Sequence, residues 1–331
     1  MREILMLATG GTIASQDAGN GLRPAITSEE ILSYVSEAAR LCRVDAIQLM
    51  NLDSTNVGPA HWLQIAQAIR ENYSRYDGFI ITHGTDTMAY TAAALSYLVQ
   101  QSPKPIVITG SQKSICMADT DARRNLYQSF LYACDQGSQG VSLVFDGKVI
   151  LGTRARKERT KSWNAFSSVD YPEIAVIRDD RIIRYLTLDT PGVEPAFYTS
   201  LDDRVLLLTL IPGMGAQALE RLSDSYQAVI LQSFGVGGLP GGDKGELAQA
   251  LKAWLDAGKT VVMMTQVSYE GSDMTVYQVG HDLKERFGLM EAYNMTMEAA
   301  VTKLMWALGQ SQRPDEVRRL FYRPVQCDII R

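Results

Sequence analysis

Short apolar runs alternate with helix-like stretches through the first half of this 331-residue chain, and this alternation constrains the fold more than any other feature. Strands that alternate with helices form βαβ units, which build a mainly parallel sheet covered by helices on both faces. The expected strands are residues 4–8, 44–49, 78–82, 105–109 and 141–145, and the expected helices are residues 28–39, 59–72, 87–99 and 121–134. We therefore expect an α/β fold.

Two of these helices have recognisable start signals. Before the helix at 28–39, Thr27 and Ser28 are followed by Glu29 and Glu30, a pattern typical of a capping box. The helix at 59–72 begins with a proline, whose missing N–H costs nothing in the first helical turn. Both signals support helices between the expected strands.

The second half of the chain differs from the first. Residues 152–184 are irregular and polar, and the segment "DTPGVEPAFYTSLDD" after them has two prolines, a glycine and no clear periodicity. A second α/β pattern follows, with expected strands at 205–211, 228–232 and 260–265 and expected helices at 216–223, 245–257, 297–308 and 314–321. A chain of this length also exceeds the usual size of a single domain. We predict two α/β domains: a larger N-terminal domain (1–187), a linker (188–203) and a smaller C-terminal domain (204–331).

The composition narrows the class of protein and its partners. The formal net charge is −5 without a long run of either sign, which argues against nucleic acid or an anionic membrane as the main partner. No apolar stretch approaches the ~20 residues of a spanning helix, and the first apolar run is too short for a signal peptide. The 4 cysteines form no CxxC pair and only 3 histidines are present, so we expect no metal site. We expect a cytoplasmic protein with reduced thiols.

Hydroxyl side chains and glycines follow successive strands of the expected N-terminal sheet. In an open α/β sheet, ligands bind just beyond the carboxyl ends of the strands. The segments at these ends are Thr9-Gly10-Gly11-Thr12, residues 51–56, "THGTDT" at 82–87 and Thr109-Gly110-Ser111-Gln112. Glycines at such positions let backbone N–H groups approach a ligand closely. This edge of the sheet suits a small polar molecule.

The first of these turns has three possible interpretations: a nucleotide loop, a nucleophile or a structural turn. The patterns GxGxxG after the first strand and GxxxxGK[ST] anywhere are absent, which argues against a nucleotide. Thr12 taken alone is most simply a turn residue. Thr85 and Asp86 place a hydroxyl beside a carboxylate, which suits attack or water orientation and the binding of a substrate ammonium. His83 is either a general base or a packed structural residue.

Two segments, "TGGTIAS" and "DGFIITHGTDTMAYTAAALSYL", resemble the signatures of the L-asparaginase family, in the family's order and spacing. The later segments "PKPIVITGSQ", "GTRARKERTKSWNAFSS", "QSFGVG" and "MTMEAAVTKL" resemble that family as well, so the resemblance extends over nearly the whole chain. The bacterial cytoplasmic (type I) branch is the most similar. The resemblance implies hydrolysis of the side-chain amide of asparagine, and sometimes of glutamine, through a covalent acyl-enzyme without metal or organic cofactor.

The resemblance also implies the catalytic residues. Thr12 corresponds to the nucleophile that attacks the amide carbon, and Thr85 flanks the scissile amide from the other side. Lys157, in the basic stretch "TRARKERTK", matches the family lysine that pairs with the second threonine, and Asp86 lies beside this pair. A threonine hydroxyl is a weak nucleophile and needs a neighbour that accepts its proton, so such a group is chemically coherent.

The substrate-binding residues follow by the same resemblance. Ser54 corresponds to the residue that binds the α-carboxylate of the substrate, and Asp86 to the one that binds its α-ammonium. Asp53 and Thr55 flank Ser54 in "DST", which is close to the type I version of this segment. We therefore expect L-asparagine to be bound by Asp53, Ser54, Thr55, Thr85 and Asp86.

The chain departs from the family pattern in two places. The family has a tyrosine that assists the nucleophile on the mobile loop after the first signature, and this chain has Leu22 there. Type I members can also bind a second, regulatory asparagine, partly through a "TQC" segment and the first residue of "SYGVG". These places are Thr265-Gln266-Val267 and Gln232 here, so we do not expect allosteric activation by asparagine.

The family's sites lie between subunits, so the resemblance implies a homodimer or homotetramer. Tyr269, Glu270 and Asp273 are candidate groups supplied by a neighbouring subunit, or else an exposed loop. The leading hypothesis is an L-asparagine amidohydrolase with minor glutaminase activity. The alternatives are a broader asparaginase-glutaminase, an amidase subunit that supplies ammonia to a tRNA-dependent transamidase, and a catalytically silent amino-acid-binding protein. Such an amidase subunit usually has an additional N-terminal domain.

Overall fold

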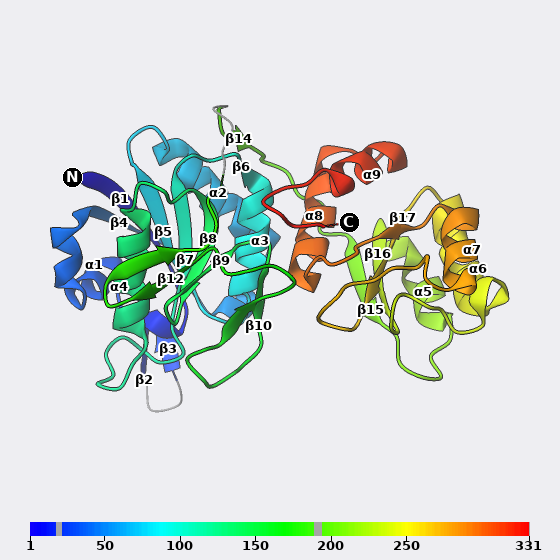
Figure 1. Ribbon diagram of the computed structural model, residues 1–331, viewed down its shortest axis with the longest axis horizontal. Coiled ribbons are helices and arrows are strands. Elements are labelled where there is room, and N and C mark those ends of the chain that lie inside the picture. Colours follow the sequence, from blue (N-terminus) through cyan, green and yellow to red (C-terminus); the bar gives the residue numbers. More distant parts are fainter. Residues whose placement is uncertain (18–21, 189–193, 331) are drawn as a thin grey trace. The chain divides into compact units, whose positions relative to one another are not determined.

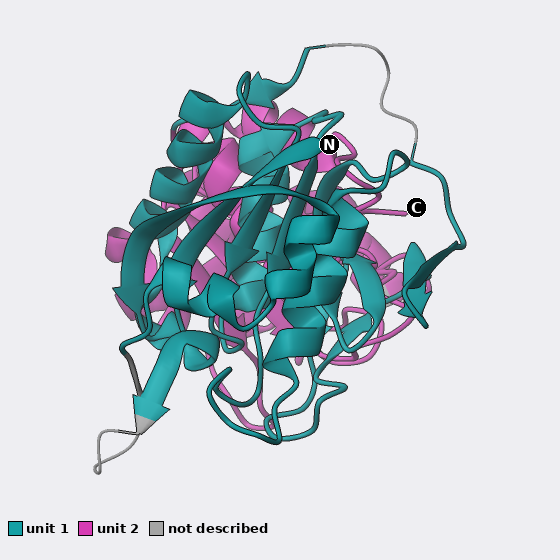
Figure 2. Cartoon of the chain, turned by 90° about the vertical axis from the view of Figure 1, so that its left-hand side faces the viewer, with its two compact units in different colours: residues 1–199 teal, residues 200–331 magenta. Residues whose placement is uncertain are grey.

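The structure is a computed structural model that describes residues 1–17, 22–188 and 194–330. The chain divides into two compact units, Met1–Thr199 and Ser200–Arg331, which Figure 2 shows in different colours. Each unit has a β-sheet of its own. The predicted pair of α/β domains, the larger one with a mainly parallel sheet, is confirmed.

The first unit is built on an eight-stranded sheet (Figure 1). Its strands are β1 (Arg2–Gly10), β4 (Cys42–Leu52), β5 (Gly78–Thr82), β7 (Pro105–Thr109), β8 (Gly140–Phe145), β9 (Lys148–Leu151), β12 (Ala175–Arg178) and β13 (Arg181–Arg184). Their order is β13-β12-β9-β8-β7-β5-β1-β4. Neighbours from β8 to β4 are parallel, and β9, β12 and β13 extend the sheet with antiparallel pairs.

Helices and short strands complete this unit. They are η1 (Thr12–Ala14), β2 (Ser15–Asp17), β3 (Leu22–Pro24), α1 (Ser28–Ser33), η2 (Ser36–Arg40), η3 (Ser54–Asn56), α2 (Pro59–Asn72), α3 (Met88–Leu98), β6 (Val99–Gln100), α4 (Ala122–Ala133), β10 (Ala155–Lys157), β11 (Phe166–Ser168) and β14 (Ala196–Phe197). All residues of β5, β7 and β8 are buried. Because successive side chains of a strand point to opposite faces, both faces of the central sheet are covered.

Two sequence predictions in this unit are wrong. The helix expected at 28–39 starts with the predicted capping box between Thr27 and Glu30, but α1 ends at Ser33. Val35 leaves helical geometry (φ −130°, ψ 49°) and is buried, and the chain continues as the separate 3₁₀ helix η2.

The stretch 152–184 is not irregular throughout, because it contains β10 to β13. Asp179 and Asp180 join β12 to β13 with φ values of 48° and 56°. Positive φ at both central residues is the geometry of a type I′ hairpin turn, for which Asn-Gly or Asp-Gly is the usual sequence signal. The Asp-Asp pair lacks the glycine of that signal, and the hairpin was therefore missed.

The second unit contains a four-stranded parallel sheet in the order β15-β16-β17-β18. Its elements are β15 (Val205–Thr209), α5 (Gln217–Leu222), η4 (Ser223–Ser225), β16 (Ala228–Ser233), η5 (Gly242–Lys244), α6 (Glu246–Asp256), β17 (Thr260–Thr265), α7 (Gln278–Phe287), β18 (Met290–Glu291), α8 (Met297–Gln310) and α9 (Pro314–Tyr322). Helix α7 was not predicted. Its end did carry signals, with basic residues in the last turn and Gly288 in a left-handed C-cap (φ 61°).

Candidate active site

Thr12 lies directly beyond the carboxyl end of β1, at the start of η1, and is half-buried. Gly10 and Gly11 before it have φ values of 101° and 78°, in the region that favours glycine. The N–H of Gly11 donates to the carbonyl of Leu52 at the end of β4 (2.8 Å), and the hydroxyl of Ser15 donates to the carbonyl of Gly11 (2.9 Å). The turn that presents Thr12 is therefore fixed by backbone geometry.

Three strand ends meet beside this turn with almost no space between them. A Cβ atom on Gly11 would lie 2.3 Å from Cα of Gly84, which follows β5. A Cβ atom on Gly84 would lie 2.6 Å from Oγ of Ser54, which follows β4. The ends of β1 and β5 thus pack backbone against backbone at Gly11 and Gly84, and Gly84 in turn packs against the side chain of Ser54. These contacts bring Thr12 and Thr85, the sequence neighbours of the two glycines, to one corner of the sheet edge.

Ser54 is 4% exposed and connects the β4 end to the β5 end. Its hydroxyl accepts a hydrogen bond from the N–H of Asp86 (3.3 Å), and its carbonyl accepts one from the hydroxyl of Thr87 (2.7 Å). These bonds hold the start of α3 against η3.

Asp53 and Thr55 bond to each other across Ser54. Oδ1 of Asp53 accepts from the N–H (2.9 Å) and from the hydroxyl (2.8 Å) of Thr55, which makes Asp53 the N-cap of η3. Both residues are exposed. Their bonds stabilise the turn that presents Ser54.

Lys157 reaches this corner from β10, a strand of the hairpin formed with β11. Its Nζ donates to Oγ1 of Thr85 (2.8 Å) and to Oδ1 of Asp86 (2.6 Å). The lysine side chain is 15% exposed, whereas that of Asp86 is 57% exposed and keeps one side open to solvent. The structure therefore brings Lys157, Thr85 and Asp86 together.

Gln112, which sequence reasoning placed only among the strand-end residues, is the second partner of Thr85. The hydroxyl of Thr85 donates to Oε1 of Gln112 (3.3 Å), and Nε2 of Gln112 donates to the carbonyls of Arg159 (3.3 Å) and Ser162 (3.1 Å). Arg159 and Ser162 belong to the loop that follows Lys157. Gln112 therefore connects the second threonine to the segment that carries the lysine.

The backbone of Gln112 is itself held by Asp121, the residue before α4. The carboxylate of Asp121 accepts from the N–H groups of Gln112 (2.9 Å) and Lys113 (3.1 Å). Burial raises the pKa of Asp121, and these N–H bonds oppose that rise. The loop after β7 is thus held in place by the buried carboxyl group of Asp121.

His83 is fully buried and is a structural residue. Its Nδ1 bonds to the carbonyl of Gly84 (2.7 Å), and its Nε2 bonds to the hydroxyl of Thr91 (3.0 Å), which also accepts from the indole N–H of Trp62 (3.0 Å). Burial lowers the pKa of His83 to about 4. The imidazole is neutral and positions the β5 end, which favours the packed alternative over a general base.

The other residues singled out in the sequence belong to the second unit or are only partly described. Leu22 pairs with Asp17 through its backbone at the start of β3, and its side chain lies outside what the structure describes. Asp273 accepts from the N–H (2.9 Å) and the hydroxyl (2.5 Å) of Thr275. Tyr269 is 47% exposed. A contribution of 269–273 to a neighbouring subunit stays a prediction.

The positions that the family resemblance links to a regulatory asparagine belong to the second unit. Gln232, at the end of β16, is 8% exposed, and its Oε1 accepts from the hydroxyl of Thr209 (2.7 Å). Nε2 of Gln266 donates to the carbonyl of Leu210 (2.7 Å), and the hydroxyl of Thr265 accepts from the N–H of Val267 (3.0 Å). These polar groups bond within the unit. The expected absence of allosteric activation stays a prediction.

The side chains at the sheet edge offer hydroxyl, carboxylate and ammonium groups. Within residues 1–17, 22–188 and 194–330, no three His, Cys, Asp or Glu side chains are grouped so that they could hold a metal ion. In that same part of the chain, no helix has the length and apolarity needed to cross a bilayer. A threonine at a strand end beside a threonine–lysine–aspartate group is a suitable arrangement for acyl transfer from a small amide.

Comparison with known proteins assigns this two-unit α/β fold to a class of amidohydrolases. Residues 3–188 match the model of the asparaginase N-terminal domain, and residues 204–321 match the glutaminase/asparaginase C-terminal domain. The L-asparaginase of Thermococcus kodakarensis is 36% identical over 328 residues, which are 99% of both chains. The chain belongs to the L-asparaginase family.

Solved structures agree with this assignment. The structure of the Thermococcus kodakarensis L-asparaginase superposes with a TM-score of 0.92 over 99% of both chains. The L-asparaginase I of Vibrio cholerae is 30% identical, with a TM-score of 0.90 over 99% of both chains. A probable cytoplasmic L-asparaginase from Campylobacter jejuni is 25% identical, with a TM-score of 0.84 over 98% of this chain and all of its own.

Another relative is named for a different activity. A glutamyl-tRNA(Gln) amidotransferase subunit of Thermoplasma acidophilum is 33% identical over 99% of this chain and 80% of its own length. The family therefore includes proteins named for two different amide-related activities.

Proposed function

We propose that the protein is an L-asparagine amidohydrolase, which hydrolyses L-asparagine to L-aspartate and ammonia. The observation that carries the proposal is the Lys157 ammonium, bonded to both Thr85 (2.8 Å) and Asp86 (2.6 Å) at the corner where the Gly11–Gly84 contact brings Thr12. This arrangement places a candidate nucleophile and a charged network that can hold an amino acid amide at neighbouring strand ends.

In the proposed reaction the hydroxyl oxygen of Thr12 forms a bond to the side-chain amide carbon of the substrate. The hydroxyl proton leaves the threonine, the amide nitrogen gains a proton, and ammonia departs as the C–N bond breaks. Water then adds to the carbon of the threonine ester, which releases aspartate and restores the hydroxyl. The bonds of Thr85 to Lys157 and Gln112 support a role in orienting the amide and then the water.

The same corner offers partners for the α-ammonium and the α-carboxylate of the substrate. The half-exposed carboxylate of Asp86 can accept the α-ammonium of the substrate while its Oδ1 stays bonded to Lys157. Ser54 is proposed to bind the α-carboxylate. We assign Asp53 and Thr55 a contribution to this binding through their mutual bonds, which fix the turn of η3.

An amidase subunit of a tRNA-dependent transamidase is the second candidate. The similarity to the amidotransferase component of Thermoplasma acidophilum supports it. The higher identity to an L-asparaginase, 36% against 33%, favours the first proposal. The two candidates differ in the amide they use, because a glutamine amidase releases ammonia faster from L-glutamine than from L-asparagine.

The experiment is ammonia release by the purified protein from L-asparagine and L-glutamine in separate assays, with Thr12→Ala beside it and Thr199→Ala, at an exposed threonine, as the matched control. We expect release from asparagine, a loss on the order of 10³-fold in Thr12→Ala and no change in Thr199→Ala. Faster release from glutamine would support the amidase alternative. No release, with asparagine still raising the melting temperature, would identify a silent binding protein.

We also propose a cytoplasmic location and a homodimer or homotetramer. The similarity to a probable cytoplasmic L-asparaginase supports the location, and the family resemblance supports the assembly. Light scattering coupled to size-exclusion chromatography measures the number of subunits directly. A monomer that retains full activity would contradict a site completed by residues 269–273 of a neighbour.

A further inference from the structure

Gln112 bonds to two parts of the candidate site through one side-chain amide. Its Oε1 accepts from the hydroxyl of Thr85 (3.3 Å), and its Nε2 donates to the carbonyls of Arg159 (3.3 Å) and Ser162 (3.1 Å). Carbonyl oxygens only accept hydrogen bonds, so the two carbonyls decide which end of the amide is the nitrogen. The oxygen end therefore faces Thr85, and the threonine hydroxyl donates its proton to Gln112.

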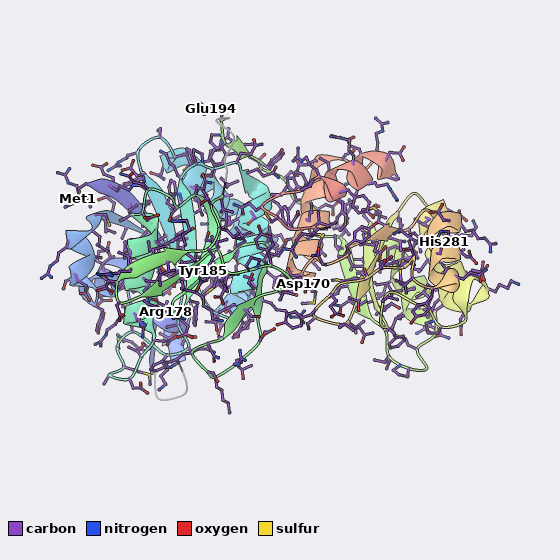
Figure 3. The ribbon with its side chains drawn as sticks, in the orientation of Figure 1. Met1, Asp170, Arg178, Tyr185, Glu194 and His281 are labelled. Atoms are coloured by element: carbon purple, nitrogen blue, oxygen red, sulfur yellow. The ribbon has the colours of Figure 1, made fainter. Side chains whose placement is uncertain are left out.

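The other partner of the Thr85 hydroxyl is Lys157, whose ammonium has protons to donate and no lone pair (Nζ to Oγ1 2.8 Å). Lys157 lies on β10, and its hairpin can be located in Figure 3 from Asp170, which follows β11. A hydroxyl group has one proton and two lone pairs. Among the bonds of the described residues, the proton goes to Gln112 and one lone pair to Lys157, which leaves the second lone pair, an acceptor, for a ligand.

The backbone that carries Gln112 is held on both sides. The N–H of Gln112 donates to the carboxylate of Asp121 (2.9 Å), which is 5% exposed. Two residues further on, the hydroxyl of Ser114 donates to the carbonyl of Ser15, three residues after Thr12. The amide of Gln112 therefore starts from a fixed point and keeps its oxygen directed at the second threonine.

We propose that Gln112 is a positioning residue that acts through Thr85 and sets the preference of the site for an amide over a carboxylate. This role rests on the proposed function, in which Thr85 flanks the side-chain amide of L-asparagine. The acceptor on Thr85 takes a hydrogen bond from the amide NH2 group of the substrate. The matching carboxylate of L-aspartate, the product, has no proton at neutral pH and sets its lone pairs against that of Thr85.

Replacement of Gln112 by methionine removes this control of the hydroxyl. Methionine is unbranched and of similar length, but its thioether is only a weak acceptor. The proton of Thr85 is then free to turn toward the ligand, where it donates to a carboxylate and no longer leaves an acceptor for the amide. Gln112→Met should therefore weaken the binding of L-asparagine and strengthen that of L-aspartate.

The test measures the dissociation constants of both amino acids by isothermal titration calorimetry. The full-length chain carries Thr12→Ala, so that L-asparagine is not consumed. We expect the further change Gln112→Met to lower the ratio of the aspartate constant to the asparagine constant about tenfold, the effect of one hydrogen bond. Gln67→Met, the same substitution at an exposed glutamine of α2, is the matched control and should leave the ratio unchanged.

Two further variants separate the hydroxyl from the loop that Gln112 also holds. Thr85→Val removes the hydroxyl, and in that background Gln112→Met should cause no further fall of the ratio. Gln112→Glu keeps an oxygen for Thr85 but loses both N–H bonds to the loop, and should keep the ratio at or above its original value. A further fall in the valine background, or a fall with glutamate, would overturn the proposal. Thermal midpoints establish that each variant is folded.

Failure of this inference can be told from failure of the proposed function. Ammonia release by the wild type and binding of L-asparagine to Thr12→Ala test the proposed function, and the absence of both would overturn that function and this inference with it. If both are observed and the ratio stays within about threefold in Gln112→Met, only the role of Gln112 is overturned.

Discussion

Replacement of Lys157 by methionine tests the charged network of the candidate site. Methionine keeps most of the side-chain length but removes the ammonium that donates to Thr85 and Asp86. If Lys157 controls the proton of Thr85, kcat should fall by about 10²–10⁴-fold, which corresponds to about 3–5 kcal/mol of transition-state stabilisation. The fold should hardly change. The Asp86 carboxylate is 57% exposed and regains water, so the lost ion pair costs about 0–1 kcal/mol of unfolding free energy.

The assay is steady-state ammonia release with L-asparagine, together with the thermal midpoint of each variant. Lys161→Met is the matched control, because Lys161 lies in the loop that follows Lys157 and has an exposed side chain. A Lys157→Met variant with kcat within about threefold of the wild type would refute the role of the lysine, since a single charge-assisted bond in the transition state is worth more. A fall of the thermal midpoint large enough to unfold the variant would instead refute the claim that the ion pair is energetically dispensable.

Three further predictions concern the frame around the site and the second unit. Acidification from pH 6.5 to 4 should lower the free energy of unfolding by about 3 kcal/mol through His83, because in this range a proton binds to the histidine of the unfolded chain but not to the buried imidazole, whose pKa is about 4. Urea titrations should show that the His83→Gln variant lacks this loss. Gly84→Ala should reduce ammonia release at least tenfold, as its Cβ would lie 2.6 Å from the serine hydroxyl, whereas Gly58→Ala, with open space, should be silent. Asp328→Asn should cost about 3–5 kcal/mol in calorimetry, because it leaves the fully buried Lys303 ammonium without its carboxylate (2.5 Å), and a small effect would contradict a charged pair.

Much of the fold could be predicted because its central elements follow simple rules. The apolar run at 78–82 and the helix at 59–72 were predicted with the bounds of β5 and α2. A strand buried on both faces reads as an unbroken apolar run, and a proline marks the first turn of a helix. The C-terminal end of α1 depends instead on Val35, which leaves the helix to enter the core. No pattern in the local sequence indicates that packing of this residue into the core ends the helix.

The residues of the candidate site could be predicted from the sequence, but the hydrogen bonds between them could not. Topology alone places Thr12, Ser54 and Thr85 at neighbouring strand ends, since carboxyl ends of parallel strands share an edge. The approach of Lys157 depends on the β10–β11 hairpin, whose three-residue strands lie in a stretch interpreted as irregular. Gln112 was visible only as a polar residue in "TGSQ", because the partners of its Nε2 are carbonyl groups, which every residue has.

The bond between Thr85 and Lys157 joins residues 72 positions apart. A contact of such sequence separation forms only after β5, β7 and β8 have paired and the β10–β11 hairpin has packed against the sheet. Long-range parallel strand pairing is the slow part of folding. An early collapsed chain with native-like helices would therefore have no turnover. Recovery of ammonia release during refolding would time the completion of the first unit, and a lag behind the return of helical circular dichroism would measure how late the hairpin closes on the sheet.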